Sequence, residues 1–121
     1  MAGSWSSITG EAIPASRQGV GELLRATGGK DWPFDIDRSV RLYMAPGMGH
    51  CGGGEGPNVF DALTALEQWR EEGKAPAEIL ASQLADGRVV RTRPLCPYPQ
   101  IAQYKGAGSI DDASNFVCRI P

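Results

Sequence analysis

A glycine-rich loop constrains the folding of this chain more than any other stretch of the sequence. Residues 44–57 read Met-Ala-Pro-Gly-Met-Gly-His-Cys-Gly-Gly-Gly-Glu-Gly-Pro and separate a strand pattern from a helix pattern. His50 is the only histidine of the chain, and Cys51 is one of three cysteines. Because glycines place no bulk around the imidazole, a ligand or another catalytic group can reach it. This placement suits an acid/base histidine, although a structural or merely exposed histidine is the simpler alternative.

The segments on either side of the loop predict a strand followed by a helix. Residues 39–44 alternate in the manner of a strand. Residues 59–72 predict a helix, with Asn58 as N-cap, Asp61 in the first turn and Gly73 as the C-terminal stop. The apolar stripe of this helix, which is expected to pack on a sheet, consists of Phe60, Leu63, Leu66 and Trp69.

The N-terminal part of the chain has weaker patterns. Residues 1–13 show no periodicity and are expected to be poorly ordered. Residues 14–27 predict a helix that the pair Gly28-Gly29 ends. At 121 residues the chain forms one domain at most, which we assign to residues 14–121.

The C-terminal part predicts a hairpin and an irregular tail. Asp86-Gly87 predicts a tight turn between strands at residues 79–84 and 88–92. From Arg93 onward prolines are frequent and little periodicity is left. This tail is expected to be held only by covering another surface and by cross-linking.

Composition and charge argue against several classes of function. The formal net charge is −2 and the 12 lysines and arginines are scattered, which argues against a nucleic-acid surface. The apolar stretches are only a few residues long, so no membrane span is expected. The first ten residues lack both a basic and an apolar region, so no signal peptide is expected, and the chain as written is interpreted as cytoplasmic or of unknown location.

A metal or cofactor site is not expected either. No second histidine accompanies His50, and the cysteines stand too far apart for a C-x-x-C pair. The glycines follow a strand and precede a helix, yet the phosphate-binding motif G-x-x-x-x-G-K-[ST] is absent.

Three stretches in sequence order carry a resemblance to a known family. They are Met-Ala-Pro-Gly-Met-Gly-His-Cys-Gly-Gly-Gly at 44–54, Gly-Pro-Asn-x-Phe-Asp-x-Leu-x-Ala-Leu-x-x-Trp at 56–69, and Arg-Pro-Leu-Cys-Pro-Tyr-Pro-Gln-x-Ala-x-Tyr-Lys-Gly-x-Gly at 93–108. With these stretches, the chain resembles the C-terminal end of the tannase and feruloyl esterase family over residues 12–118.

The resemblance implies an α/β fold, namely the C-terminal part of an α/β-hydrolase domain: the last strand, its helix, a small hairpin and a disulfide-tied, proline-rich tail. It implies a carboxylic ester hydrolase that acts on aromatic acyl esters through a Ser-Asp-His triad, without a cofactor. His50 matches the triad histidine, and Cys51 matches a clamp cysteine whose partner stands beside the serine. Cys96 and Cys118 match a local disulfide. Members of the family are typically secreted.

The chain departs from the family pattern at the other two triad positions. It contains neither a G-x-S-x-G motif nor a Cys-Ser pair, so the serine nucleophile is absent from these 121 residues. Near the expected aspartate position the only carboxylate is Glu11, which is a candidate acid, with a plain surface charge as the simpler alternative. We therefore expect no ester hydrolysis by these residues alone, because the histidine acts on a serine that a missing N-terminal part of the hydrolase supplies.

Two alternatives stay open at the level of sequence. The first is a non-catalytic binding or assembly module, or a relic, in which the stripe of the helix at 59–72 docks on a partner that supplies the rest of the sheet. The second concerns the cysteines, which could be three reduced thiols of a cytosolic protein.

Overall fold

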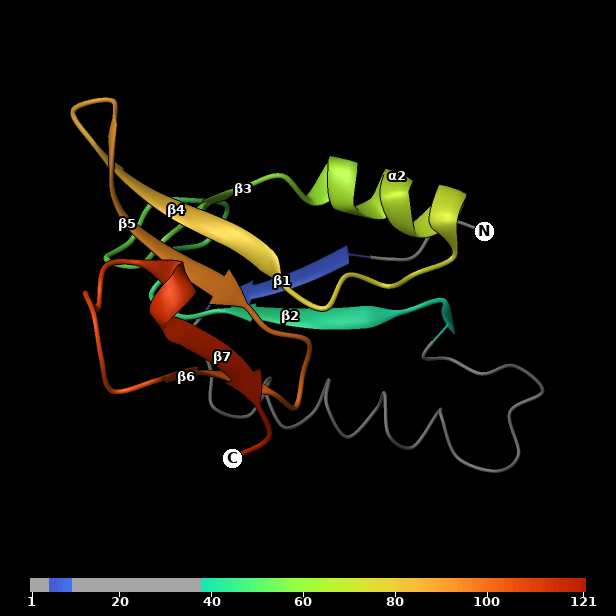
Figure 1. The fold of residues 1–121 in the computed structure, drawn as a ribbon. Helices are drawn as coiled ribbons and strands as arrows, with labels where there is room; N and C mark the ends of the chain where they lie inside the picture. The colour runs from blue at the N-terminus through green and yellow to red at the C-terminus, as the bar shows by residue number, and fades with distance from the viewer. Residues whose placement is uncertain (1–4, 10–37) are drawn as a thin grey trace.

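A computed structural model describes residues 5–9 and 38–121 of the chain. Strand β1 (Trp5–Thr9) pairs in parallel with strand β2 (Arg41–Ala45), as Figure 1 shows. Strand β2 confirms the strand predicted at 39–44, whereas no strand was expected within residues 1–13. β1 is short and shows no periodicity of its own, so it was recognisable only through its pairing with β2. The predicted helix at 14–27 and the candidate acid Glu11 lie outside the described residues.

Strand β2 is covered on both of its faces. Leu42 and Tyr43 point to opposite faces, and each is only 4% exposed. The Tyr43 hydroxyl donates a hydrogen bond to the carbonyl oxygen of Pro76, and burial raises the pKa of this phenol. A strand with two covered faces is typical of the interior of a parallel sheet.

A second sheet contains strands β3 (Val59–Phe60), β4 (Ile79–Ala85) and β5 (Arg88–Leu95), in that order and all antiparallel. The predicted hairpin is therefore confirmed, although β5 continues to Leu95. Asp86 and Gly87 form its turn with φ angles of 50° and 74°. Two successive positive φ angles define the type I′ turn, whose twist matches that of the paired strands.

Helix α2 (Ala62–Glu72) begins later than the sequence predicted. Val59 and Phe60 belong to β3, because they pair with Ser82 and Ala81 of β4. The N-cap is consequently Asp61 rather than Asn58, and its carboxylate accepts from the backbone N–H of Thr64. The predicted C-terminal stop is confirmed, since the left-handed Gly73 donates its N–H to the carbonyl oxygen of Trp69.

The predicted stripe of α2 only partly faces the protein. Leu63 is 66% exposed, and no residue of α2 is buried. The half-buried residues of α2 follow each other at helical spacing on a side of the helix that does not include Leu63. It consists of Ala62, Ala65, Leu66 and Trp69.

The tail forms a hairpin that sequence patterns did not reveal. Strand β6 (Ile101–Tyr104) pairs antiparallel with β7 (Phe116–Arg119), and the 3-10 helix η2 (Ala113–Asn115) precedes β7. The hairpin lies beside β5 (Figure 1). The expected disulfide between Cys96 and Cys118 is present, with the two Cα atoms 5.5 Å apart. These two cysteines are therefore not the reduced thiols of the alternative interpretation.

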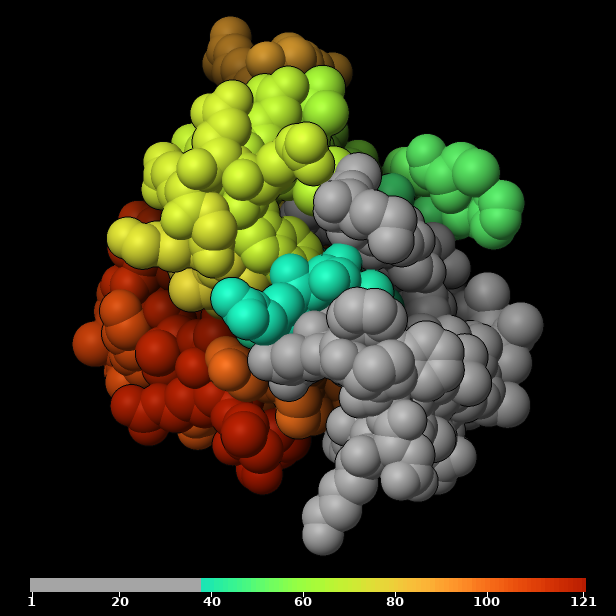
Figure 2. Space-filling model, turned by 90° about the vertical axis from the view of Figure 1, so that its right-hand side faces the viewer, coloured from blue at the N-terminus to red at the C-terminus, as the bar shows by residue number. Residues whose placement is uncertain are grey.

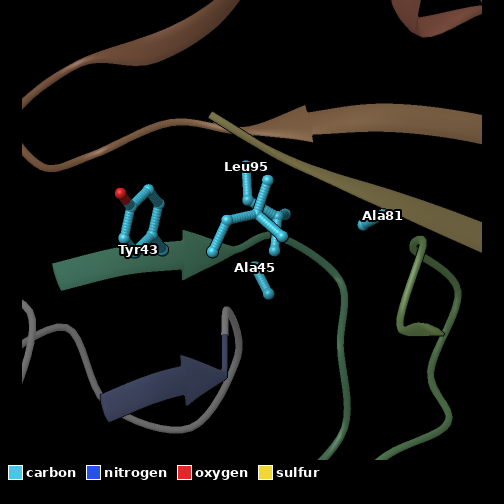
Figure 3. Packing of buried hydrophobic residues seen from close by; sticks show 5 residues of the cluster. Tyr43, Ala45, Ala81 and Leu95 are labelled. Atoms are coloured by element: carbon cyan, nitrogen blue, oxygen red, sulfur yellow. The ribbon is translucent and has the colours of Figure 1, made fainter. Parts of the chain in front are cut away.

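The hydrophobic core lies between strand β2 and the sheet of β3, β4 and β5. Figure 3 shows side chains of β2, β4 and β5 meeting between the strands. The cluster consists of Tyr43, Ala45, Ile79, Ala81 and Leu95. Met48, from the glycine-rich loop, packs against this cluster, so the loop begins directly on the core.

Candidate functional site

The glycine-rich loop leaves β2 and closes on itself at its base. The N–H of Gly56 donates to the carbonyl oxygen of Gly47 at 2.9 Å, and the N–H of Gly49 donates to that of Gly53, also at 2.9 Å. Met48 and Gly54 form an isolated antiparallel bridge between these two bonds. The loop is therefore a narrow hairpin of backbone, with its tip at residues 50–53.

Glycine is required where the two sides of this hairpin touch. A Cβ atom at Gly54 would collide with the carbonyl oxygen of Gly47, and one at Gly56 would collide with that of Pro46. Gly54 also has a φ of 96°, which L side chains rarely adopt. At the tip, by contrast, a Cβ at Gly52 or Gly53 would meet nothing within 4 Å.

The tip presents His50 and Cys51, and both residues are exposed. The Sγ atom of Cys51 lies 3.0 Å from Nδ1 of His50. Within the described ranges no hydrogen bond involves the other ring nitrogen, Nε2. An imidazole with one nitrogen held and the other accessible can exchange a proton with a group that approaches it. Cys51 is a free cysteine with a φ of 65°, an uncommon conformation for a residue other than glycine.

The side-chain amides of Gln83, in β4, and of Asn58, just after the loop, donate to carbonyl oxygens at the end of the loop. The side chain of Gln83 donates to the carbonyl oxygen of Glu55 at 3.0 Å, and that of Asn58 donates to the carbonyl oxygen of Gly56 at 3.1 Å. The backbone N–H of Asn58 also donates to Ser82. Asn58 thus closes the loop instead of capping the helix. Gln83 gave no signal in the sequence, because its role depends on the pairing of β4 with β3.

A groove of about 650 Å³ lies beside the base of the loop. It runs between β5 and the β6–β7 hairpin, and Pro46, Gly56 and Pro57 contribute to its rim. His50 and Cys51 do not line it. Arg91 and Arg93, which the sequence analysis did not single out, are the charged side chains among the described residues that line it. Their i, i+2 spacing within a predicted strand was the available signal, because such residues share one face.

The loop projects from the surface, in the segment coloured green in Figure 2.

A family model described as "Tannase and feruloyl esterase" matches residues 14–119. The chain belongs to the tannase and feruloyl esterase family. The resemblance that the three sequence stretches carried is therefore confirmed.

Curated relatives agree with this membership. A mono(2-hydroxyethyl) terephthalate hydrolase from Piscinibacter sakaiensis is 52% identical over 85 residues, which cover 68% of this chain and 14% of the relative. A probable feruloyl esterase from Arthroderma benhamiae is 35% identical over 124 residues, which cover 95% of this chain and 22% of the relative. The chain thus spans less than a quarter of the length of these relatives.

Solved structures agree on the fold. The crystal structure of feruloyl esterase B from Aspergillus oryzae superposes with a TM-score of 0.80 at 24% identity, covering 97% of this chain and 26% of that structure. An esterase from the same organism gives a TM-score of 0.78 at 25% identity. The chain therefore shares its fold with part of these esterase structures, which are of the α/β-hydrolase type.

The predicted site residues have different outcomes in the structure. His50 and Cys51 lie side by side at the loop tip, whereas Glu11 lies outside the described residues. Among residues 5–9 and 38–121, no group of three or more His, Cys, Asp or Glu side chains is arranged to hold a metal ion. In the same part of the chain, no helix has the length and apolar character needed to cross a membrane.

Proposed function

We propose that this chain contributes the histidine-bearing part of the active site of a carboxylic ester hydrolase of the tannase and feruloyl esterase type, with aromatic acyl esters as substrates. The observation that carries the proposal is His50, exposed at the tip of a loop that follows β2 and that close backbone contacts hold in shape. Family membership supports the same reaction. Strand β2, the loop and α2 would be the last strand, the histidine loop and the following helix of the hydrolase.

In this proposal His50 takes the proton of a serine hydroxyl and later returns it to the leaving alcohol. The serine is supplied by polypeptide outside these 121 residues, which contain no G-x-S-x-G motif. The same outside part supplies the surface that binds the aromatic group. These residues alone are therefore expected to leave methyl ferulate and methyl gallate intact.

Cys51 has a separate role in the proposal. As an exposed, free thiol beside His50, it would form a disulfide with a cysteine next to the serine and so fix the histidine loop against the nucleophile. The disulfide between Cys96 and Cys118 supports an oxidising, extracellular location, because such bonds persist there and are rare in the cytosol.

A chimera tests the catalytic role of His50. The segment of the Piscinibacter sakaiensis hydrolase that aligns with this chain is replaced by the corresponding residues of this chain, which are 52% identical to it. We expect the chimera to hydrolyse mono(2-hydroxyethyl) terephthalate, and His50→Ala to reduce kcat by at least about 10³-fold. Glu55→Gln, in the same loop, is the matched control and should leave kcat unchanged. A folded chimera without activity, or an active His50→Ala variant, would contradict the proposal.

A second candidate function is a non-catalytic assembly module, and one observation favours it. Helix α2 has no buried residue, and Leu63 leaves most of its side chain exposed. A face of this kind could dock on a partner polypeptide that supplies the rest of the sheet. Leu63→Glu distinguishes the two functions: under the assembly function it abolishes co-purification with the partner, and His50→Ala has no effect on it.

A further inference from the structure

The groove beside the loop base has apolar walls and a charged end. Its walls include Leu95, Ile101 and Phe116, and Ile101 is 52% exposed. Its volume, about 650 Å³, lies within the range of pockets that hold small organic molecules. Among the described residues, its lining contains two arginines and no Asp or Glu side chain.

The two arginines project from one face of β5. Nε of Arg91 donates to Oδ1 of Asp111 at 2.6 Å, and Nη1 of Arg93 donates to the carbonyl oxygen of Ile110 at 2.8 Å. The guanidinium of Arg93 also lies 3.8 Å from the centre of the Phe116 ring. Each guanidinium has five N–H donors, and these bonds use one donor of each.

The positive charge at this end is only partly neutralised. Burial lowers the pKa of Arg93 most, the like charge of Arg91 lowers it further, and Asp111 raises it least. Among the described residues, Arg91 is paired with the carboxylate of Asp111, whereas the hydrogen bond of Arg93 goes to a neutral backbone carbonyl. An anion placed between the two guanidiniums would gain charge-assisted hydrogen bonds that the protein itself does not supply.

We propose that this groove binds a small aromatic carboxylate, with the carboxylate group on the free N–H donors of Arg91 and Arg93 and the ring against Ile101 and Phe116. The charge requires an anion, and the apolar walls require a ring or chain behind it. The choice of an aromatic acid rests on the proposed function, whose hydrolysis step releases such acids. Binding itself needs neither the serine nor His50.

Titration of the 121-residue protein with ferulate, followed by amide NMR shifts and calorimetry, tests the proposal. We expect ferulate to shift the amides of β5 and β6, and methyl ferulate, which has the same ring and no charge, to bind at least about tenfold more weakly. Hexanoate, an anion without a ring, should also bind more weakly. Equal affinity for ferulate and methyl ferulate would overturn the proposal.

Three variants distinguish the effect of the Arg91 charge on ferulate binding from an effect on folding. Arg91→Gln should weaken ferulate binding about tenfold, and Asp111→Asn should strengthen it several-fold because it releases Arg91. The backbone carbonyl of Asp111, which accepts from Thr92, is retained in that variant. Arg88→Gln, an exposed arginine of β5 outside the groove, is the control and should change nothing. If Arg91→Gln fails to fold, unchanged affinity in Asp111→Asn still contradicts the proposal.

The outcome is independent of the proposed function. His50→Ala should bind ferulate as the unsubstituted chain does, since His50 does not line the groove. If the chimera is inactive but ferulate binds, the hydrolase function fails and the groove proposal stands. If the chimera is active but ferulate does not bind, the groove proposal fails and the hydrolase function stands.

Discussion

At the scale of single residues, the glycines of the loop divide into two kinds. A Cβ atom at Gly47, Gly49, Gly54 or Gly56 would collide with the backbone of the loop, whereas one at Gly52 or Gly53, at the open tip, would meet nothing within 4 Å. Only the first kind is required by contact. The base can therefore hold the loop in shape while the tip keeps His50 accessible.

A pair of alanine substitutions separates these two kinds of glycine. Gly53→Ala and Gly54→Ala both place a side chain at positive φ, with values of 67° and 96°. Gly53→Ala should cost about 1–2 kcal/mol of stability from backbone strain alone. Gly54→Ala should cost more, because its Cβ collides with Gly47 and the base must open.

Hydrogen exchange provides the readout for this pair. The amides of Gly49 and Gly56 donate across the loop base. We expect both amides to lose protection in Gly54→Ala and to keep it in Gly53→Ala. Equal protection in the two variants would show that the contact at Gly54 does not shape the loop.

At the scale of elements, α2 shows how a carboxylate fixes the start of a helix. Asp61 accepts from both the backbone N–H and the hydroxyl of Thr64, at 2.9 and 2.7 Å. These two bonds lower the pKa of Asp61. Ionised Asp61 therefore contributes stability above its unfolded pKa of 3.8, and this contribution is lost as the pH falls through the lower folded value.

A pH series on Asp61→Ala tests this cap. At pH 6 the variant should have a lower free energy of unfolding than the unsubstituted chain. This difference in free energy should become smaller as the pH falls below 3.8. Asp112, whose pKa is lowered in the same direction by Ser114, is intact in both proteins and cancels in the comparison. A gap that is constant between pH 6 and pH 2 would contradict a role for the ionised carboxylate.

The turn between β4 and β5 is a second element whose sequence dictates its shape. Gly87→Ala should destabilise the hairpin by about 1 kcal/mol, because φ at this position is 74° and no atom lies within 4 Å of the added Cβ. Asp86→Asn is the control and should be nearly neutral, since Asn tolerates positive φ. Chemical denaturation measures both. A neutral Gly87→Ala would mean that the turn adopts another type.

At the scale of the whole molecule, turns and helix ends could be predicted from neighbouring residues, whereas some strands are defined only by their pairing with distant strands. The turn at Asp86-Gly87 and the stop at Gly73 were predicted because their chemistry lies within a few residues. Val59-Phe60 looked helical, but pairing with β4 makes them a strand. Strand β1 has no pattern of its own and is defined by its alignment with β2.

The candidate site also has features that could be predicted from the sequence and one that could not. The position of His50 at an accessible loop tip followed from the surrounding glycines, and the pairing of Cys96 with Cys118 followed from family resemblance. The arginine groove depends on the β6–β7 hairpin folding back onto β5 over a distance that no short pattern encodes.

The disulfide is a covalent link between strand β7 of this distant hairpin and the residue that follows β5. It closes a loop with a sequence separation of 22, which in the chain-entropy model is worth about 3 kcal/mol. The double variant Cys96→Ser/Cys118→Ser should lose about that much stability in chemical denaturation. Cys51→Ser is the control and should lose none, because Cys51 is free and exposed.

The order of local unfolding tests the same link further. Without the disulfide, the hairpin is still attached to β5 through the ion pair of Arg91 with Asp111 and the bond from the N–H of Thr92 to the carbonyl oxygen of Asp111. Two further bonds, from Arg93 to the carbonyl oxygen of Ile110 and from the N–H of Ala113 to the Thr92 hydroxyl, also remain. The ion pair is partly exposed, so it contributes at most about 1 kcal/mol. We therefore expect the Thr92 amide to exchange faster in the double variant, while the β4–β5 pairing near Ala81 stays protected. Equal acceleration at Thr92 and Ala81 would show instead that the disulfide stabilises the molecule as one cooperative unit.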